Sequence, residues 1–180
     1  AAQIINNAQT IISRNAPLTK QAAVLTFGKI EAGVRNNIIP EYAEMIGTIR
    51  TLDLDMQKMI FERFKKIVEK TAESNGARAE LIINDGVPIT YNDPALTALM
   101  GPTFVDVAGV ENVNPSIDAT TGAEDFSFYA NEIPALFFRL GGMPKGNDPR
   151  KAPSHHTPDF YVDDSGLLLG IKAMSRLVVD

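Results

Sequence analysis

Length, composition and charge limit the classes of protein to which this chain can belong. The chain has 180 residues, enough for one domain of ordinary size or two small ones, and its apolar fraction of 44% and charged fraction of 22% are typical of a globular protein. The net charge of -5 argues against a nucleic-acid partner, because phosphate binding requires a basic surface. No apolar run reaches transmembrane length, so no membrane partner is expected. Cysteine is absent, which excludes disulfides and a thiol nucleophile and leaves His and carboxylates as metal ligands.

The first half of the chain predicts a helix followed by a hairpin. Residues 1–14 place their apolar side chains on one helical stripe: Ile4, Ile5, Ala8, Ile11 and Ile12. No capping residue or initiator Met precedes this helix, so we expect the chain to be part of a longer protein. Residues 21–34 and 41–52 are rich in apolar and β-branched residues, which predicts two strands paired around a turn at residues 35–37.

A long helix and a third strand are expected next. Asp53 is suited to cap this helix, because its carboxylate can accept a hydrogen bond from an N–H group of the first turn. Asn75-Gly76 is expected to end it. The apolar face of the helix consists of Met56, Ile60, Phe64, Ile67, Val68 and Thr71. Residues 77–83 predict a further strand.

The second half predicts two more helices and a strand. Asp93 and Pro94 provide an N-cap and a first helical residue, and the helical pattern continues to about residue 108, with a kink or break expected at Pro102. Residues 135–140 predict a short buried strand, and residues 141–154 form a long Gly/Pro/Lys loop. The final helix, about residues 164–178, is expected to turn one apolar face inward: Leu167, Leu168, Ile171, Met174 and Leu177.

Together these elements predict an α/β chain in two parts. Residues 1–90 are expected to form a small α+β unit in which antiparallel strands pack against two helices. Residues 91–180 are expected to form a piece of a larger α/β domain. The sequence contains no internal repeat and no low-complexity tract, and it does not indicate a cellular compartment.

The chain has only two histidines, and they are adjacent, at His155 and His156. They follow the long loop and precede Thr157-Pro158, a place suited to a metal ligand or an acid/base group and equally to a polar surface turn. Adjacent residues of an extended chain point in opposite directions, so at most one of the two is expected to face a given metal ion.

Two further positions are candidates for chemistry. Glu124 and Asp125 follow Gly122 at a predicted loop-to-helix junction, where they can bind a metal, act as acid or base, or orient a substrate amine. The residues alone favour the simpler interpretation that one of them caps a short helix. Arg50 lies late in a predicted strand and suits a carboxylate clamp, although an ion pair with a nearby Glu is the simpler interpretation. Asn37 can be an ordinary turn residue.

Three segments taken in order resemble one family. Gly33-Val-Arg-Asn-Asn37-Ile-Ile-Pro40, followed by Gly47-Thr-Ile-Arg50-Thr51, resembles the lid-domain hairpin of the metallopeptidase family that holds aminoacylases, dimeric carboxypeptidases and auxin-conjugate hydrolases. Gly122-Ala-Glu124-Asp125-Phe126-Ser127 resembles its Gly-x-Glu-Asp-Phe-Ser segment. His156-Thr157-Pro158 resembles its late His-x-Pro metal-ligand motif. The bacterial amidohydrolase branch, with hippurate hydrolases and thermostable carboxypeptidases, is the most similar.

The resemblance implies an enzyme that hydrolyses the amide bond of N-acyl amino acids or peptides. It implies two divalent metal ions (Zn, Mn, Co or Ni), a metal-activated water and a homodimer formed through the lid. Residues 1–90 would be the lid, without its first strand, and residues 91–180 the carboxyl-terminal segment of the catalytic domain. His156 would be a metal ligand, Asn37 and Arg50 would reach a substrate, and Glu124 would lie near the active site.

The chain also departs from the family pattern. The family's other metal ligands and its catalytic Glu precede the lid, and no second His pair in this chain can replace them. One His and two acidic residues are too few for a dinuclear site. The chain alone is therefore expected to be inactive, and the alternative is a non-catalytic dimerisation or binding module derived from the family.

Overall fold

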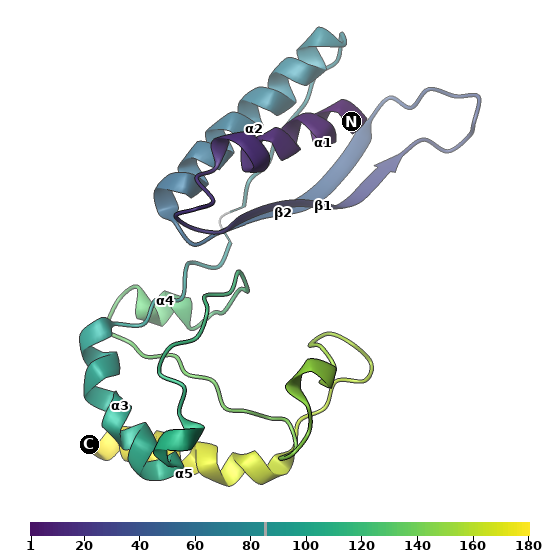
Figure 1. The fold of residues 1–180 in the computed structure, drawn as a ribbon. Helices are drawn as coiled ribbons and strands as arrows, with labels where there is room; N and C mark the ends of the chain where they lie inside the picture. Colours follow the sequence, from purple (N-terminus) through teal and green to yellow (C-terminus); the bar gives the residue numbers. More distant parts are fainter. Residues whose placement is uncertain (85) are drawn as a thin grey trace. The chain divides into compact units, whose positions relative to one another are not determined.

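The computed structural model describes residues 1–84 and 86–180 and divides the chain into two compact units (Figure 1). Unit 1 comprises Ala1–Ile89 and Ala119–Glu124, and unit 2 comprises Thr90–Asp118 and Asp125–Asp180. Helices and antiparallel strands both occur, which confirms the predicted α/β class. The assignment of the two units to a lid and a catalytic segment stays a prediction.

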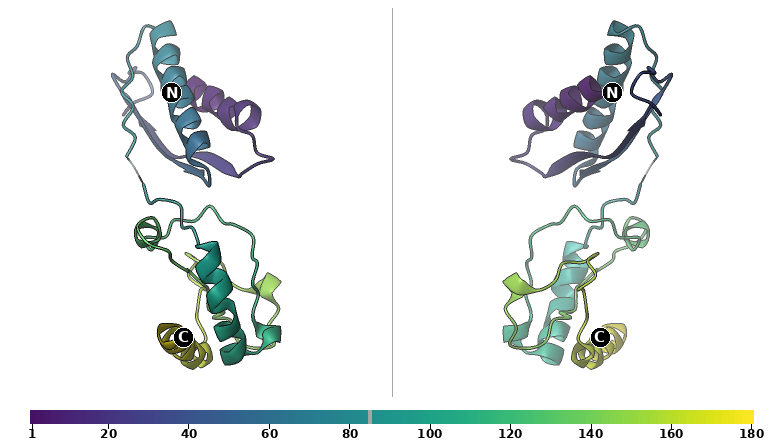
Figure 2. Two further views of the ribbon diagram at one scale, coloured as in Figure 1. Left: turned by 90° about the vertical axis from the view of Figure 1, so that its left-hand side faces the viewer. Right: turned by 90° about the vertical axis from the view of Figure 1, so that its right-hand side faces the viewer.

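Unit 1 packs two helices on one face of a β-hairpin (Figures 1 and 2). Helix α1 spans Ala2–Thr10 and continues as a π-helical turn over Ile11–Asn15, as the apolar stripe predicted. Strands β1 (Ala23–Ala32) and β2 (Ala43–Thr51) pair antiparallel, which confirms the predicted hairpin. Helix α2 spans Leu54–Ser74, and the Met56 N–H donates to the Asp53 carboxylate at 2.7 Å, the predicted cap.

The core of unit 1 lies between the hairpin and the helices. Alternate strand residues point to it, because successive side chains of a strand lie on opposite faces. Phe27 of β1 and Phe64 of α2 meet edge to face with ring centroids 5.9 Å apart. The fully or almost fully buried members of this core are Ala8, Ile11, Ala23, Leu25, Met56 and Ile60. The opposite face of the hairpin is open and carries polar residues such as Arg50.

The hairpin contains a register irregularity between Phe27 and Lys29. Close to it, a Cβ added to Gly47 would lie 2.2 Å from the carbonyl oxygen of Thr26, nearer than any side chain can be accommodated. Gly28, on the other strand, has no atom within 4 Å of such a Cβ. Gly47 is therefore required for the close approach of the two strands, whereas Gly28 is not.

The strand predicted over residues 77–83 is not formed, although it belongs to unit 1. Within the described residues the sheet of this unit consists of β1 and β2 alone. An extended segment becomes a strand only when a neighbouring strand accepts and donates its main-chain hydrogen bonds. Apolar composition predicted the extended conformation of this segment, but composition carries no information about a pairing partner.

Unit 2 is built on two helices that lie side by side (Figure 1). Helix α3 spans Pro94–Ala108, and the Leu96 N–H donates to the predicted cap Asp93 at 2.7 Å. Pro102 lies inside α3 without splitting it, so the break that was one of the two expected outcomes does not occur. Helix α5 spans Leu167–Val179, and the remaining helical segments are one α-helix and three 3-10 turns: α4 (Ser127–Ala130), Val110–Asn112, Pro149–Lys151 and Asp164–Gly166.

The prediction for the inward face of α5 was wrong for four of its five residues. Leu167, Leu168, Ile171 and Met174 are between 52% and 63% exposed. Ala173 is the buried residue of the helix, and Leu169 and Leu177, four positions to either side of it, are half-buried. Because α5 is apolar on most of its circumference, its periodicity offers two possible inward stripes. The small side chain of Ala173 permits a closer helix approach than the larger residues would.

The strand predicted over residues 135–140 is also absent from the structure. A side chain takes the place of a neighbouring strand, because the Asn92 amide donates to the Phe137 carbonyl and accepts from the Phe137 N–H, both at 2.8 Å. The Asp93 N–H donates to the Ala135 carbonyl at 2.9 Å. Phe138 packs edge to face on Phe104 of α3, with centroids 4.8 Å apart. The segment is thus extended and half-buried without belonging to a sheet.

Candidate functional site

The four predicted site residues are divided between the two units. Asn37, Arg50 and Glu124 belong to unit 1, and His156 belongs to unit 2.

Asn37 and Arg50 lie at opposite ends of the hairpin. Asn37 is exposed in the turn between β1 and β2, beyond the last ladder pair, Ala32 with Ala43. Arg50 pairs with Val24 at the other end of the ladder. The seven residue-to-residue steps from Ala43 to Arg50 span roughly 23 Å at the usual strand rise of about 3.3 Å per residue. The hairpin of a single chain therefore does not bring these two side chains to one small ligand.

Arg50 makes a hydrogen bond to a residue that is distant in the sequence. Its Nη1 donates to the main-chain carbonyl of Thr121 at 2.8 Å. The glutamates that the simpler interpretation offered as its ion-pair partners include Glu31 and Glu44, but these pair with Lys29 of β1, at 2.7 Å and 3.1 Å. Arg50 thus contacts the segment that ends at Glu124. A main-chain acceptor gives no sequence signal, so this partner could not be predicted.

Glu124 is half-buried at the end of Ala119–Glu124 and just before α4. Helix α4 has Phe126 as its N-cap and no capping side-chain hydrogen bond, so neither candidate carboxylate caps it in that way. Phe126 packs against Phe137, with ring centroids 5.6 Å apart. Ser127 is fully buried, and its hydroxyl has no hydrogen-bond partner among the described residues.

The two histidines have different surroundings. His155 meets the ring of Phe160 edge to face, with centroids 4.7 Å apart. His156 has a φ of 63°, the left-handed region, and no other non-glycine residue of the described chain has a positive φ. The Thr157 hydroxyl donates to the Ser154 carbonyl at 2.7 Å and closes this turn. The two imidazole rings also lie edge to face, with centroids 6.4 Å apart, so the difference between the histidines is the Phe160 contact of His155 and the unusual backbone of His156.

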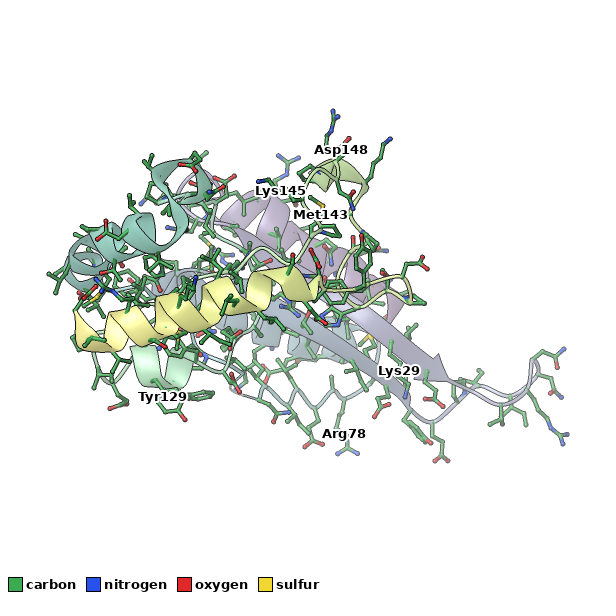
Figure 3. The ribbon with its side chains drawn as sticks, turned by 90° about the horizontal axis from the view of Figure 1, so that it is seen from below. Lys29, Arg78, Tyr129, Met143, Lys145 and Asp148 are labelled. Carbon is green, nitrogen blue, oxygen red and sulfur yellow. The ribbon has the colours of Figure 1, made fainter. Side chains whose placement is uncertain are left out.

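The loop before the histidines lines a small, partly open pocket of about 180 Å³. Met143 and Asp148 are among the loop residues that line it (Figure 3). Asp148 is paired with Arg150 at 2.9 Å, and the Arg150 guanidinium lowers the pKa of this carboxyl by hydrogen bonding to it. Ligand pockets for small molecules usually exceed about 300 Å³. This pocket by itself is too small to be a substrate site.

The described residues do not form a complete metal centre. Within residues 1–84 and 86–180, no three His, Asp or Glu side chains are grouped closely enough to hold a metal ion. A dinuclear site needs more ligands than a single imidazole. The residues that the structure describes therefore do not fit such a site as a whole, and the assignment of His156 as one of its ligands stays a prediction. In the same part of the chain, no helix is long and apolar enough to cross a membrane.

Comparison with known proteins identifies the family. The model of peptidase family M20/M25/M40 matches residues 9–180. The chain belongs to this family. Membership confirms the resemblance drawn from the three motifs of the sequence.

Relatives within the M20 family are only partly covered by the chain. It is 35% identical over 178 residues to an N-acetyldiaminopimelate deacetylase of Streptococcus thermophilus, matching 96% of this chain and 46% of that protein. It is 33% identical over 168 residues to the uncharacterized hydrolase y4tI of Sinorhizobium fredii, matching 93% of this chain and 40% of that protein. The chain therefore spans less than half the length of these relatives.

Solved M20-like structures agree with the fold. A candidate aminohydrolase from methicillin-resistant Staphylococcus aureus superimposes with a TM-score of 0.82 and 26% identity, over 99% of this chain and 45% of that one. The Bacillus subtilis YXEP protein, described as a dinuclear metal binding peptidase of the M20 family, superimposes with a TM-score of 0.71 and 25% identity, over 99% of this chain and 44% of that one.

Proposed function

We propose that a protein containing this chain is a metal-dependent amidohydrolase that cleaves the amide bond of N-acyl amino acids or small peptides. The observation that carries the proposal is the M20 family match over residues 9–180. The deacetylase relative supports the substrate class, because its name describes the removal of an acetyl group from an N-acetylated amino acid. A non-catalytic dimerisation or binding module is the alternative that the experiments below must exclude.

The complete protein would hold two divalent metal ions, as the YXEP protein is described to do. Zn, Mn, Co and Ni suit a site of imidazole and carboxylate ligands. His156 would supply one imidazole, since it stands directly before Thr157-Pro158, whereas the edge-to-face contact with Phe160 is made by His155. The other ligands would come from outside these 180 residues, in keeping with the incomplete set of ligands among the residues that the structure describes.

The histidine assignment is tested by two variants of the complete protein. His156→Ala should lower both the bound metal, measured by elemental analysis, and the hydrolysis of N-acyl amino acids. His155→Ala is the matched control and should retain its metal and most of its activity. Equal metal loss in both variants, or loss only in His155→Ala, would contradict the assignment. A complete wild-type protein that binds no metal and hydrolyses no such amide would favour the alternative.

Arg50 and Asn37 are proposed to contact the substrate from different subunits. A guanidinium binds a carboxylate through two parallel hydrogen bonds, and an amide can donate to a carbonyl oxygen. The distance of roughly 23 Å along the hairpin, from the usual strand rise, is too long for both to serve one small substrate from the same chain. A homodimer formed through unit 1 would allow Arg50 of one subunit and Asn37 of its partner to meet at one site.

Exposed apolar residues at the hairpin turn support such a dimer. Val34, Ile39 and Tyr42 are between 80% and 93% exposed. Groups of exposed apolar side chains commonly mark interaction surfaces. Sedimentation of the complete protein at micromolar concentration should give a dimer, and Ile39→Asp should shift it toward monomer, whereas Thr48→Asp on the open face of β2 serves as a charge-matched control. A protein that sediments as a strict monomer would contradict both the dimer and the shared site.

A further inference from the structure

Residues 119–124 form a segment, here called the strap, that no pattern in the sequence distinguishes from its neighbours. Both neighbours of this segment, Asp118 and Asp125, belong to unit 2, yet the segment itself belongs to unit 1. The strap adopts no helix or strand, so it lacks the repeating main-chain hydrogen bonds that hold such elements in place. Its position in unit 1 must therefore depend on individual contacts.

We propose that Arg50 is a positioning residue that anchors this strap, and with it Glu124, to the open face of the hairpin. The Arg50 Nη1 donates to the Thr121 carbonyl at 2.8 Å, across 71 positions of sequence. Bonds from a charged donor are stronger than bonds between neutral groups. The consequence for catalysis rests on the proposed function, in which Glu124 lies near the active site.

The backbone around Arg50 is held firmly within unit 1. Its neighbour Ile49 pairs with the buried Leu25 on the core face of the hairpin, so Arg50 points to the opposite, open face. Shortly after it the chain enters α2, whose first turn is fixed by the Asp53 cap. The guanidinium therefore projects from a part of unit 1 held on two sides, by strand pairing and by a capped helix.

Anchoring Thr121 restrains Glu124. The two residues are three positions apart, and an extended chain covers at most about 3.6 Å per residue, so their Cα atoms are within about 11 Å. Without the anchor, the position of the six-residue strap would be restrained only by its two ends and by its other contacts. With it, the half-buried Glu124 is kept near the hairpin face that carries Arg50.

The guanidinium can anchor the strap and still bind a ligand. Arg has five N–H donors, and the Thr121 carbonyl occupies one of them. A carboxylate needs two parallel donors, which the edge formed by Nε and Nη2 can provide. Arg50 can thus hold a substrate carboxylate and the strap that carries Glu124 at the same time. In this arrangement the Arg50 side chain sets the distance between the substrate carboxylate and Glu124.

Proteolysis of the 180-residue chain tests the anchor without substrate or metal. A protease that cuts after Glu should cleave after Glu124 slowly in the wild type, and the fragment 1–124 can be quantified by mass spectrometry. Arg50→Met keeps a stem of similar length but has no donor, and should speed this cleavage about fivefold, the factor that one hydrogen bond typically contributes. Arg50→Lys keeps a charged donor and should remain close to the wild-type rate.

Two controls keep the test specific. Cleavage after Glu69, inside α2, reports unfolding of unit 1 and should not change in any variant. Arg35→Met removes the same charge from the exposed hairpin turn, and should leave cleavage after Glu124 at the wild-type rate. Equal rates for Arg50→Met and Arg50→Lys, or an equal acceleration by Arg35→Met, would overturn the anchor. Neither result would affect the metal-binding test of His156, so failure of the anchor and failure of the proposed function are distinguishable.

Discussion

At the scale of single residues, the backbone of His156 connects conformation with chemistry. A non-glycine residue in the left-handed region costs roughly 1 kcal/mol, and such positions persist where the surrounding structure or a function requires them. His156 is such a residue, with a φ of 63°, and it is also the proposed metal ligand. The cost is consistent with a side chain that is placed for binding rather than for packing.

This conformation predicts a reversal of the usual preference between alanine and glycine. His156→Gly and His156→Ala both delete the imidazole, but only alanine keeps a Cβ in the left-handed region. We expect the Gly variant to be more stable than the Ala variant by about 1 kcal/mol. At His155, where φ is not positive, Gly should be the less stable of the two. Urea unfolding of the four variants measures both differences, and an Ala variant at position 156 more stable than its Gly counterpart would contradict the conformation.

At the scale of elements, the hairpin depends on a close contact between its strands. Gly47→Ala would place a Cβ 2.2 Å from the Thr26 carbonyl oxygen, so β1 and β2 must separate or shift. We expect a loss of about 2–3 kcal/mol in the free energy of unfolding, the usual scale of overpacking. Since Arg50 lies three residues further along β2, the strap should also become more accessible to protease.

Gly28→Ala is the matched control for this prediction. Its added Cβ meets nothing within 4 Å, and the residue does not have a positive φ. Its stability should stay within about 0.5 kcal/mol of the wild type, as for an ordinary surface substitution. Thermal unfolding followed by circular dichroism compares the two variants. Similar melting temperatures for Gly47→Ala and Gly28→Ala would show that the strands can adjust at little cost.

At the scale of the whole molecule, the number of available ligands limits the activity of the chain. A catalytic zinc normally has three protein ligands and an open position. The described residues contain no group of three potential ligands, and the one imidazole proposed as a ligand is that of His156. The 180-residue chain should therefore bind zinc or manganese only weakly and should not hydrolyse hippurate.

Calorimetric titration with each metal and an assay with hippurate test this prediction together. We expect a dissociation constant above the micromolar range and no turnover, and His156→Ala should weaken the residual binding further. Submicromolar affinity accompanied by turnover would mean that these 180 residues contain a complete site. In that case the proposed dependence on ligands from outside the chain would be wrong.

The amino-acid sequence by itself determined the features that depend on neighbouring residues. Helix positions followed from apolar spacing, and the caps Asp53 and Asp93 followed from a carboxylate three positions before an N–H group of the first turn. The hairpin followed from two apolar segments on either side of a turn predicted at residues 35–37, although the observed connection between the strands is longer, residues 33–42. The three motifs were sufficient to indicate the family, which the match over residues 9–180 confirms.

The tertiary structure decided whatever depends on a distant partner. Residues 77–83 and 135–140 have strand-like composition, but whether an extended segment becomes a strand is set by what pairs with it, and for Phe137 that partner is the Asn92 side chain. The inward face of α5 was set by the close packing that Ala173 permits, not by its period. The partner of Arg50 is a main-chain carbonyl 71 residues away, and every residue type has that carbonyl. Local hydrogen bonding and periodicity are encoded in short stretches of sequence, whereas pairing and packing are fixed only when the folded chain brings distant segments together.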